Sequence, residues 1–104
     1  MIGEALRLIR VFHDTTLTEL AKDFDVSASY LSEIENEKRK ANLDLIQRYA
    51  KKFSIRPSAI MFFSEEIDDE TILGKTKISI RDKMLKLMKS IEKYKFEASQ
   101  LDDL

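Results

Sequence analysis

The stretch that decides the fold is Thr16–Asn36, TLTELAKDFDVSASYLSEIEN. Its first half has the apolar spacing of a short helix, because Leu20, Ala21 and Phe24 recur at i, i+1 and i+4 and so share one face. The stretch opens with a threonine followed three positions later by a glutamate, which is the spacing of a capping box. The sequence therefore predicts a helix over 16–24.

The second half of the stretch predicts another helix, over 27–36. Leu31 and Ile34 mark its inner face, and Ser27 is a favourable N-cap. Because only Asp25–Val26 separate the first helix from this cap, the two helix axes must cross steeply. Two short helices joined in this way have the geometry of a helix-turn-helix, whose second helix can enter the DNA major groove.

Three further helices are expected around this pair, over 4–13, 42–53 and 57–63. Asn42 is a suitable cap for the second of them, and Pro57 suits the first turn of the third. Together the five helices predict a compact all-α domain over 1–64. Its predicted core is the apolar set Leu6, Ile9, Leu20, Ala21, Val26, Leu31, Ile34, Ile46, Ala50, Phe53 and Ile60.

The remainder of the chain predicts a linker and one more helix. The acidic, glycine-containing segment after the domain lacks periodicity, and we expect a linker over 65–78. A helix over 79–104 follows, in which apolar residues alternate at spacings of four and three, as in pairing helices. This stripe either packs on its own domain or pairs two copies of the chain, and we favour pairing. The residues expected to pair are Ile80, Met84, Leu87, Ile91 and Tyr94.

The first helix carries a related feature. Leu8, Val11 and Phe12 form an apolar patch on the side away from Leu6 and Ile9. Clustered exposed apolar residues indicate a surface that another element covers. We expect the C-terminal helix, from the same chain or a second copy, to cover it.

Composition is consistent with a small helical protein. Among 104 residues, 43% are hydrophobic, and only two are glycine and one proline, which favours helices joined by tight turns. Cysteine is absent, which excludes disulfides and thiolate metal sites and is compatible with a reducing compartment. The sequence shows no apolar run long enough to span a membrane and no signal peptide at its start. A cytoplasmic protein is therefore expected.

Charge and reactive residues argue for binding rather than catalysis. The formal net charge is −1, and the one dense basic run, Lys38-Arg39-Lys40, directly follows the second helix of the pair, where a helix-turn-helix approaches the DNA backbone. The single histidine, His13, is expected to be a packed side chain rather than a general base. The sequence contains no cysteine nucleophile, phosphate-cradling glycine loop or metal-spaced histidine cluster. We therefore expect neither enzymatic activity nor a metal or cofactor.

Residues 2–64 resemble the Cro/cI-type (XRE) helix-turn-helix family of phage repressors and bacterial regulators. The matching segments are IGEALRLIR, ELA, VSASYLSEIEN and NLDLIQRYAKKFSI. The resemblance implies a five-helix repressor-like domain that binds double-stranded DNA, as a homodimer, and regulates transcription, most often as a repressor.

The resemblance also implies particular site residues. It pairs Arg10 with Glu35, which would fix the orientation of two helices. It places Ala28 where it can touch a thymine methyl and Ser29 where it can pair with either base, and Glu33 could accept from a cytosine amino group. Asn36 and the basic run would face phosphates. The full set of implied DNA contacts is Leu17, Thr18, Ser27, Ala28, Ser29, Ser32, Glu33, Asn36, Lys38, Arg39 and Lys40.

The chain departs from the family at two positions. Leu17 stands where a phosphate-binding glutamine is common, and Glu37 stands where glycine is usual, so a positive φ there would be strained or the turn would differ. The helix over 27–36 also lacks an arginine or glutamine for bidentate base contact. We therefore expect DNA binding that is weak, depends on dimerisation or is aided by a partner.

Two alternatives share the same scaffold. An antitoxin-type regulator would bind DNA and also a protein partner, whereas a purely protein-binding helical module would not bind DNA. Phosphate contacts impose a steep salt dependence on affinity, and protein contacts need not. A salt titration of DNA binding therefore separates the alternatives.

Overall fold

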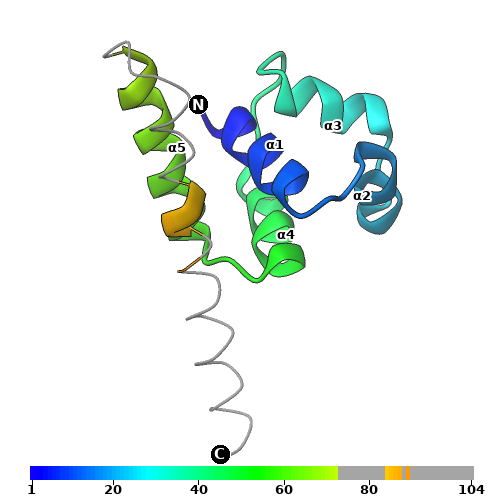
Figure 1. Cartoon of the computed structure of the whole chain (residues 1–104). Helices are drawn as coiled ribbons and strands as arrows, with labels where there is room; N and C mark the ends of the chain where they lie inside the picture. Colours follow the sequence, from blue (N-terminus) through cyan, green and yellow to red (C-terminus); the bar gives the residue numbers. More distant parts are fainter. Residues whose placement is uncertain (73–83, 88, 90–104) are drawn as a thin grey trace, which may run out of the picture.

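The computed structural model describes residues 1–72, 84–87 and 89, and every regular element there is an α-helix (Figure 1). α1 lies in the middle, where it packs against α3, α4 and α5, while α2 and α3 pack against each other. This arrangement confirms the predicted all-α fold. The five helices are α1 (Ile2–Phe12), α2 (Leu17–Phe24), α3 (Ala28–Glu35), α4 (Leu43–Phe53) and α5 (Pro57–Ile72).

The predicted caps set the boundaries of these helices. The Thr16 hydroxyl accepts from the Glu19 backbone N–H at 3.1 Å, and the Glu19 carboxylate accepts from the Thr16 N–H at 3.4 Å, which completes the capping box. Ser27 and Asn42 each accept the N–H three residues further on, at 3.0 and 2.8 Å. Pro57 begins α5, where its missing N–H removes no helical hydrogen bond.

The core lies between α1 and the helices around it. Every residue of the predicted core is buried except Val26, which is half-buried and packs against the core from the turn between α2 and α3. The structure adds buried residues that the predicted core list did not include, namely Ala5, Phe24, Leu45, Tyr49, Ile55, Phe63, Ile67, Met84 and Leu87.

α5 is longer than predicted, so the prediction of a linker over 65–78 is wrong in its first part. The helix continues to Ile72, and residues 73–78 lie outside the described residues. Phe63 and Ile67 lie three and seven residues after Ile60, which keeps all three on one face of the helix, and all three are buried. Glutamate favours helices, and three of the five acidic residues over 65–70 are glutamates, so the acidic composition does not require the helix to end.

Part of the C-terminal stripe packs on its own domain. Residues 84–87 are helical, and Met84 and Leu87 are 5% and 6% exposed within the core of the same chain. For these two residues the structure shows the alternative of packing within one chain. Three residues expected to pair, Ile80, Ile91 and Tyr94, lie outside the described residues.

The apolar patch on α1 is covered only in part. Leu8 is half-buried and packs against the core, whereas Val11 and Phe12 are 48% and 45% exposed. On α5, Met61 and Phe62 are also exposed, at 44% and 63%. The described part of the chain therefore presents large apolar side chains on both α1 and α5.

Candidate nucleic-acid interface

The chain reverses between α2 and α3 within residues 25–27. Asp25 ends α2 in the left-handed region, with φ at 55°, and the Val26 N–H donates to the Ala21 carbonyl at 3.0 Å. Ser27 is extended and begins α3. This tight connection holds α3 against α2 and leaves the far side of α3 uncovered by α2.

α3 has a buried face and an open face. Leu31 and Ile34 are fully buried, whereas Ser29 on the other face is exposed. Ala28 and Ser32 are half-buried. A helix that reads DNA must divide its residues in this way, because its inner face holds it on the domain while its outer face meets the bases.

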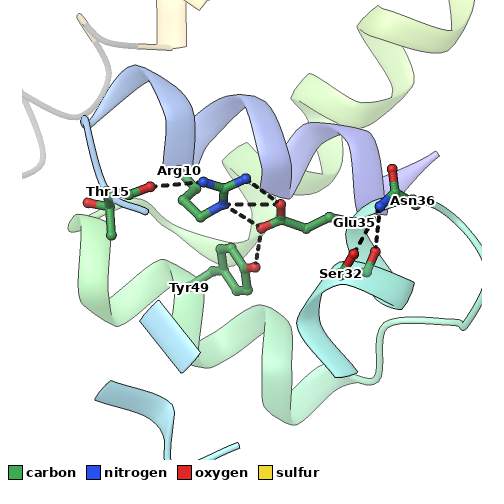
Figure 2. A network of polar contacts seen from close by, with 6 residues as sticks. All are labelled: Arg10, Thr15, Ser32, Glu35, Asn36 and Tyr49. Atoms are coloured by element: carbon green, nitrogen blue, oxygen red, sulfur yellow. Dashed lines mark hydrogen bonds and ion pairs between the residues drawn. The ribbon is translucent and has the colours of Figure 1, made fainter. Parts of the chain in front are cut away.

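Ser32 is less open than expected because it is bonded to Asn36 (Figure 2). The Asn36 side-chain amide donates to the Ser32 carbonyl at 2.9 Å and to its hydroxyl at 3.2 Å. Asn36 itself is exposed at the C-terminal end of α3. The amide nitrogen is thus occupied within the protein, which leaves the Asn36 Oδ1 to accept a hydrogen bond from a donor such as a base amino group.

Of the two residues at the start of α2 that the resemblance implies as DNA contacts, Thr18 is exposed and Leu17 is half-buried. Leu17, at the position where the family commonly has glutamine, is half-buried and packs against the core. Thr18 beside it is exposed. The packing explains the departure, because the side chain at 17 is used for the core and not for a phosphate.

A buried ion pair joins α1 to α3 (Figure 2). The Arg10 Nε donates to both carboxylate oxygens of Glu35, at 3.1 and 3.0 Å, and its Nη2 donates to Oε1 at 2.8 Å. Its Nη1 donates to the Thr15 carbonyl at 2.9 Å. The hydrogen bonds to Glu35 raise the pKa of Arg10. The pair implied by the family resemblance is therefore formed, and it fixes the last turn of α3 against α1.

Tyr49 of α4 is a third member of this network. Its hydroxyl donates to the Glu35 Oε2 at 2.7 Å, and the side chain is fully buried. Burial, followed by the hydrogen bond to Glu35, raises the pKa of the Tyr49 phenol far above its ordinary value of 10.0. One carboxylate thus holds α1, α3 and α4 together, and with them the orientation of the proposed reading helix.

The turn after α3 has Glu37 at the position where the family usually has glycine, and the Glu37 side chain has a structural role. Glu37 adopts a φ of 63°, and its carboxylate accepts the Glu4 backbone N–H at 2.9 Å. Since α1 has no side-chain cap of its own, Glu37 supplies one from the turn after α3.

The start of α1 also approaches α3 closely at Gly3. A side chain there would place its Cβ 2.1 Å from the Ile34 carbonyl oxygen, so glycine is required for this close approach.

The basic run lies exposed on the loop that follows α3. Lys38, Arg39 and Lys40 are all exposed, and the N–H groups of the first two donate to the Glu33 carbonyl, at 2.8 and 3.2 Å. The Arg39 Nε also donates to the Glu33 carboxylate at 2.9 Å. Its guanidinium carbon lies 5.4 Å from the ring centroid of Tyr30. The loop is therefore tied to α3 by both its backbone and its arginine.

His13 is a packed side chain, as predicted. Its Nδ1 lies 2.7 Å from the Ile9 carbonyl oxygen, and its ring packs against Phe53 with centroids 4.7 Å apart. Among the described residues, no group of three or more metal-ligating side chains comes together, and no helix is long and apolar enough to cross a membrane.

Sequence reasoning missed two aromatic residues of this region. Tyr49 is one of them, and its buried hydroxyl donates to Glu35, in keeping with the general need of a buried tyrosine hydroxyl for a partner. Tyr30 is the other, and its ring contacts the guanidinium of Arg39. Their partners, Glu35 and Arg39, lie on other elements, so local spacing does not indicate either contact. The general need of a buried tyrosine for an acceptor is the one signal that could have identified Tyr49.

Comparison with known proteins agrees with this geometry. The helix-turn-helix family model matches residues 6–60, which include α2, the turn, α3 and the loop after it. No curated protein and no solved structure matches the chain. The match covers more than half of the chain, and the α2–turn–α3 unit that it contains is formed in the structure. The chain therefore belongs to the Cro/cI-type helix-turn-helix family of DNA-binding transcription regulators.

Proposed function

We propose that this protein represses transcription by placing α3 in the major groove of a specific DNA site. The observation that carries the proposal is the division of α3, which buries Leu31, Ile34 and Glu35 and leaves Ser29 open. Small polar residues on an open helical face allow close approach to base edges. Ser29 and Ser32 would bond to bases and Ala28 would contact a thymine methyl.

Phosphate contacts would come from both sides of α3. Lys38 and Lys40 are exposed on the loop after it, and Thr18 and Ser27 are exposed at the starts of α2 and α3. Such contacts fix the register of a protein on the duplex without reading sequence. The near-neutral charge of the whole chain is compatible with this role, because the exposed lysines Lys38 and Lys40 follow α3 directly.

Homodimerisation is part of the proposal. One reading helix contacts only a few base pairs, so two copies bound about one DNA turn apart, roughly 34 Å, would give a useful specificity. Pairing through the C-terminal stripe would use residues other than Met84 and Leu87, which are buried in their own chain, or would exchange this segment between copies. Met61 and Phe62 on α5 offer an exposed apolar surface as a second site of pairing.

Selection of bound sites from random DNA with the purified protein tests the groove assignment. We expect an enriched palindrome for the natural protein and its loss in Ser29→Glu. Ser58→Glu is a matched control, since Ser58 is exposed at the second position of α5, as Ser29 is at the second position of α3. Enrichment of the same palindrome by Ser29→Glu would show that α3 does not read the DNA.

The salt dependence of binding separates this function from protein binding alone. Contacts from Lys38 and Lys40 should each contribute about one unit to the slope of log affinity against log salt concentration. Lys40→Gln should therefore flatten the slope by about one unit on every DNA sequence. A natural protein without affinity for DNA would instead favour the protein-binding module, and DNA binding together with capture of a protein partner would favour the antitoxin-type regulator.

Sedimentation distinguishes the two sites of pairing. Phe62 is 63% exposed, so Phe62→Asp should leave the fold intact and should convert dimer to monomer if α5 pairs. Leu87 is 6% exposed, so Leu87→Asp should lower the melting temperature if the stripe is core. A folded, monomeric Leu87→Asp variant would assign the pairing to the stripe.

A further inference from the structure

Three contacts hold Arg39 against α3, and an arginine that only attracts phosphates requires none of them. Its Nε donates to the Glu33 carboxylate at 2.9 Å, and its backbone N–H donates to the Glu33 carbonyl at 3.2 Å. Its guanidinium carbon lies 5.4 Å from the centroid of the Tyr30 ring. Because Tyr30 and Glu33 are three residues apart, they lie on one side of α3. These contacts bring the guanidinium from the loop to the side of the helix.

The remaining donors of Arg39 suit a guanine. Within the described part of the chain, its Nη1 and Nη2 form no hydrogen bond, and the side chain is 56% exposed. Two coplanar amino groups match the O6 and N7 acceptors on the major-groove edge of guanine. α3 itself, ASYLSEIE, contains no arginine, lysine or glutamine that could form such a contact. The loop arginine can therefore supply a kind of base contact that the helix lacks.

The charge of the pair argues in the same direction. The carboxylate of Glu33 offsets the charge of Arg39, so the two together release few counterions when they approach DNA. Lys38 and Lys40 have no acidic partner among the described contacts and are the better phosphate ligands. With its carboxylate bonded to Arg39, Glu33 is also less available to accept from a cytosine.

We propose that Arg39 reads a guanine in the operator and that Tyr30 and Glu33 are the residues that position it. This inference rests on the proposed DNA-binding function. It differs from a phosphate contact in its consequence, because a base contact changes the preference among sequences, whereas a phosphate contact changes the affinity for all sequences equally.

A charge-neutral double substitution tests the proposal. Glu33→Gln with Arg39→Gln removes one charge of each sign, so the salt slope should stay as in the natural protein. The preference for guanine at one operator position should fall by about tenfold or more, the discrimination of a good bidentate contact. Arg39→Lys is a second variant, in which the charge is kept but the planar fork is lost. A lysine can still donate to a guanine but without the planar fork, so this exposed variant should show a reduced preference, smaller than in the natural protein and larger than in the double variant.

Each outcome is distinct, with melting temperatures measured for every variant. A guanine preference retained in full by the double variant, or an operator without a guanine, would overturn the proposal. A uniform loss of affinity with a slope flattened by about one unit in Arg39→Gln alone, without a change of preference, would make Arg39 a phosphate contact. If the natural protein enriches no DNA site at all, the proposed function itself fails, which is a different result from any of these.

Discussion

Tyr49→Phe removes a single hydroxyl from the network that holds the reading helix, and its cost can be worked out from the structure. The hydroxyl donates to the Glu35 Oε2 at 2.7 Å in a fully buried position. A hydrogen bond to a charged group contributes about 1.5–3 kcal/mol to stability. Since Arg10 still donates to the same oxygen at 3.0 Å, we expect the lower end of this range.

The matching control is Tyr30→Phe, which makes the same chemical change at a half-buried tyrosine. The described contacts of Tyr30 involve its ring and its backbone, and phenylalanine keeps both. Its unfolding free energy should change by less than about 0.5 kcal/mol. Urea denaturation followed by circular dichroism measures both variants. A loss of about 1.5 kcal/mol in Tyr49→Phe corresponds to a melting temperature lowered by roughly 6–12 °C.

The same substitution should change the response to alkali. The pKa of Tyr49 is raised in the folded state, mainly by burial and then by the bond to Glu35. Below the ordinary tyrosine pKa of 10.0, both the folded and unfolded states hold the proton, and the stability is fully present. Above it only the unfolded state releases the proton, so stability falls by up to about 1.4 kcal/mol per pH unit. Tyr49→Phe should lose this contribution, and its stability should fall less steeply above about pH 10.

Two results would refute the reasoning. If Tyr49→Phe costs no more than Tyr30→Phe, the buried hydroxyl contributes nothing to holding Glu35. If both variants lose stability equally steeply in alkali, the phenol of Tyr49 does not keep its proton in the folded protein. Operator affinity provides an independent measurement. The Arg10–Glu35 pair should still orient α3 without the Tyr49 hydroxyl, so Tyr49→Phe should reduce the free energy of operator binding less than it reduces the free energy of unfolding.

Further predictions follow from the turn, the helix contact and the core. Glu37→Gly should be more stable than Glu37→Ala by about 1 kcal/mol. Both variants lose the cap on α1, but only glycine accepts a φ of 63° without strain. Equal urea midpoints for the two variants would argue against that strain. Gly3→Ala should lower the unfolding free energy by about 1–3 kcal/mol, since its Cβ would lie 2.1 Å from the Ile34 carbonyl oxygen, and an unchanged melting temperature would contradict this contact. Leu87→Ala should cost about 2–5 kcal/mol at every protein concentration, whereas a cost that appears only at concentrations where the natural protein is dimeric would place Leu87 between subunits.

The helix-turn-helix could be predicted from the sequence because its determinants are local. The capping box of Thr16 and Glu19 and the cap at Ser27 act within three residues of themselves, and the spacing of Leu31 and Ile34 reports directly which face is buried. The end of α5 differs from the prediction, although its signal is present in the sequence. Ile67 continues the buried spacing of the helix, but the acidic residues around it are equally typical of a linker.

The sequence by itself determined the helices, the turn and the face of α3 that is open, since each depends on residues a few positions apart. The family resemblance implied that Arg10 meets Glu35, but only the tertiary structure decided that Tyr49 joins them on the same carboxylate. Glu35 lies 25 residues from Arg10 and 14 from Tyr49, and no local spacing indicates that one carboxylate serves both. Likewise, an apolar stripe has the same period whether it packs on its own chain or on another, so the burial of Leu87 could be known only once the helices were placed together.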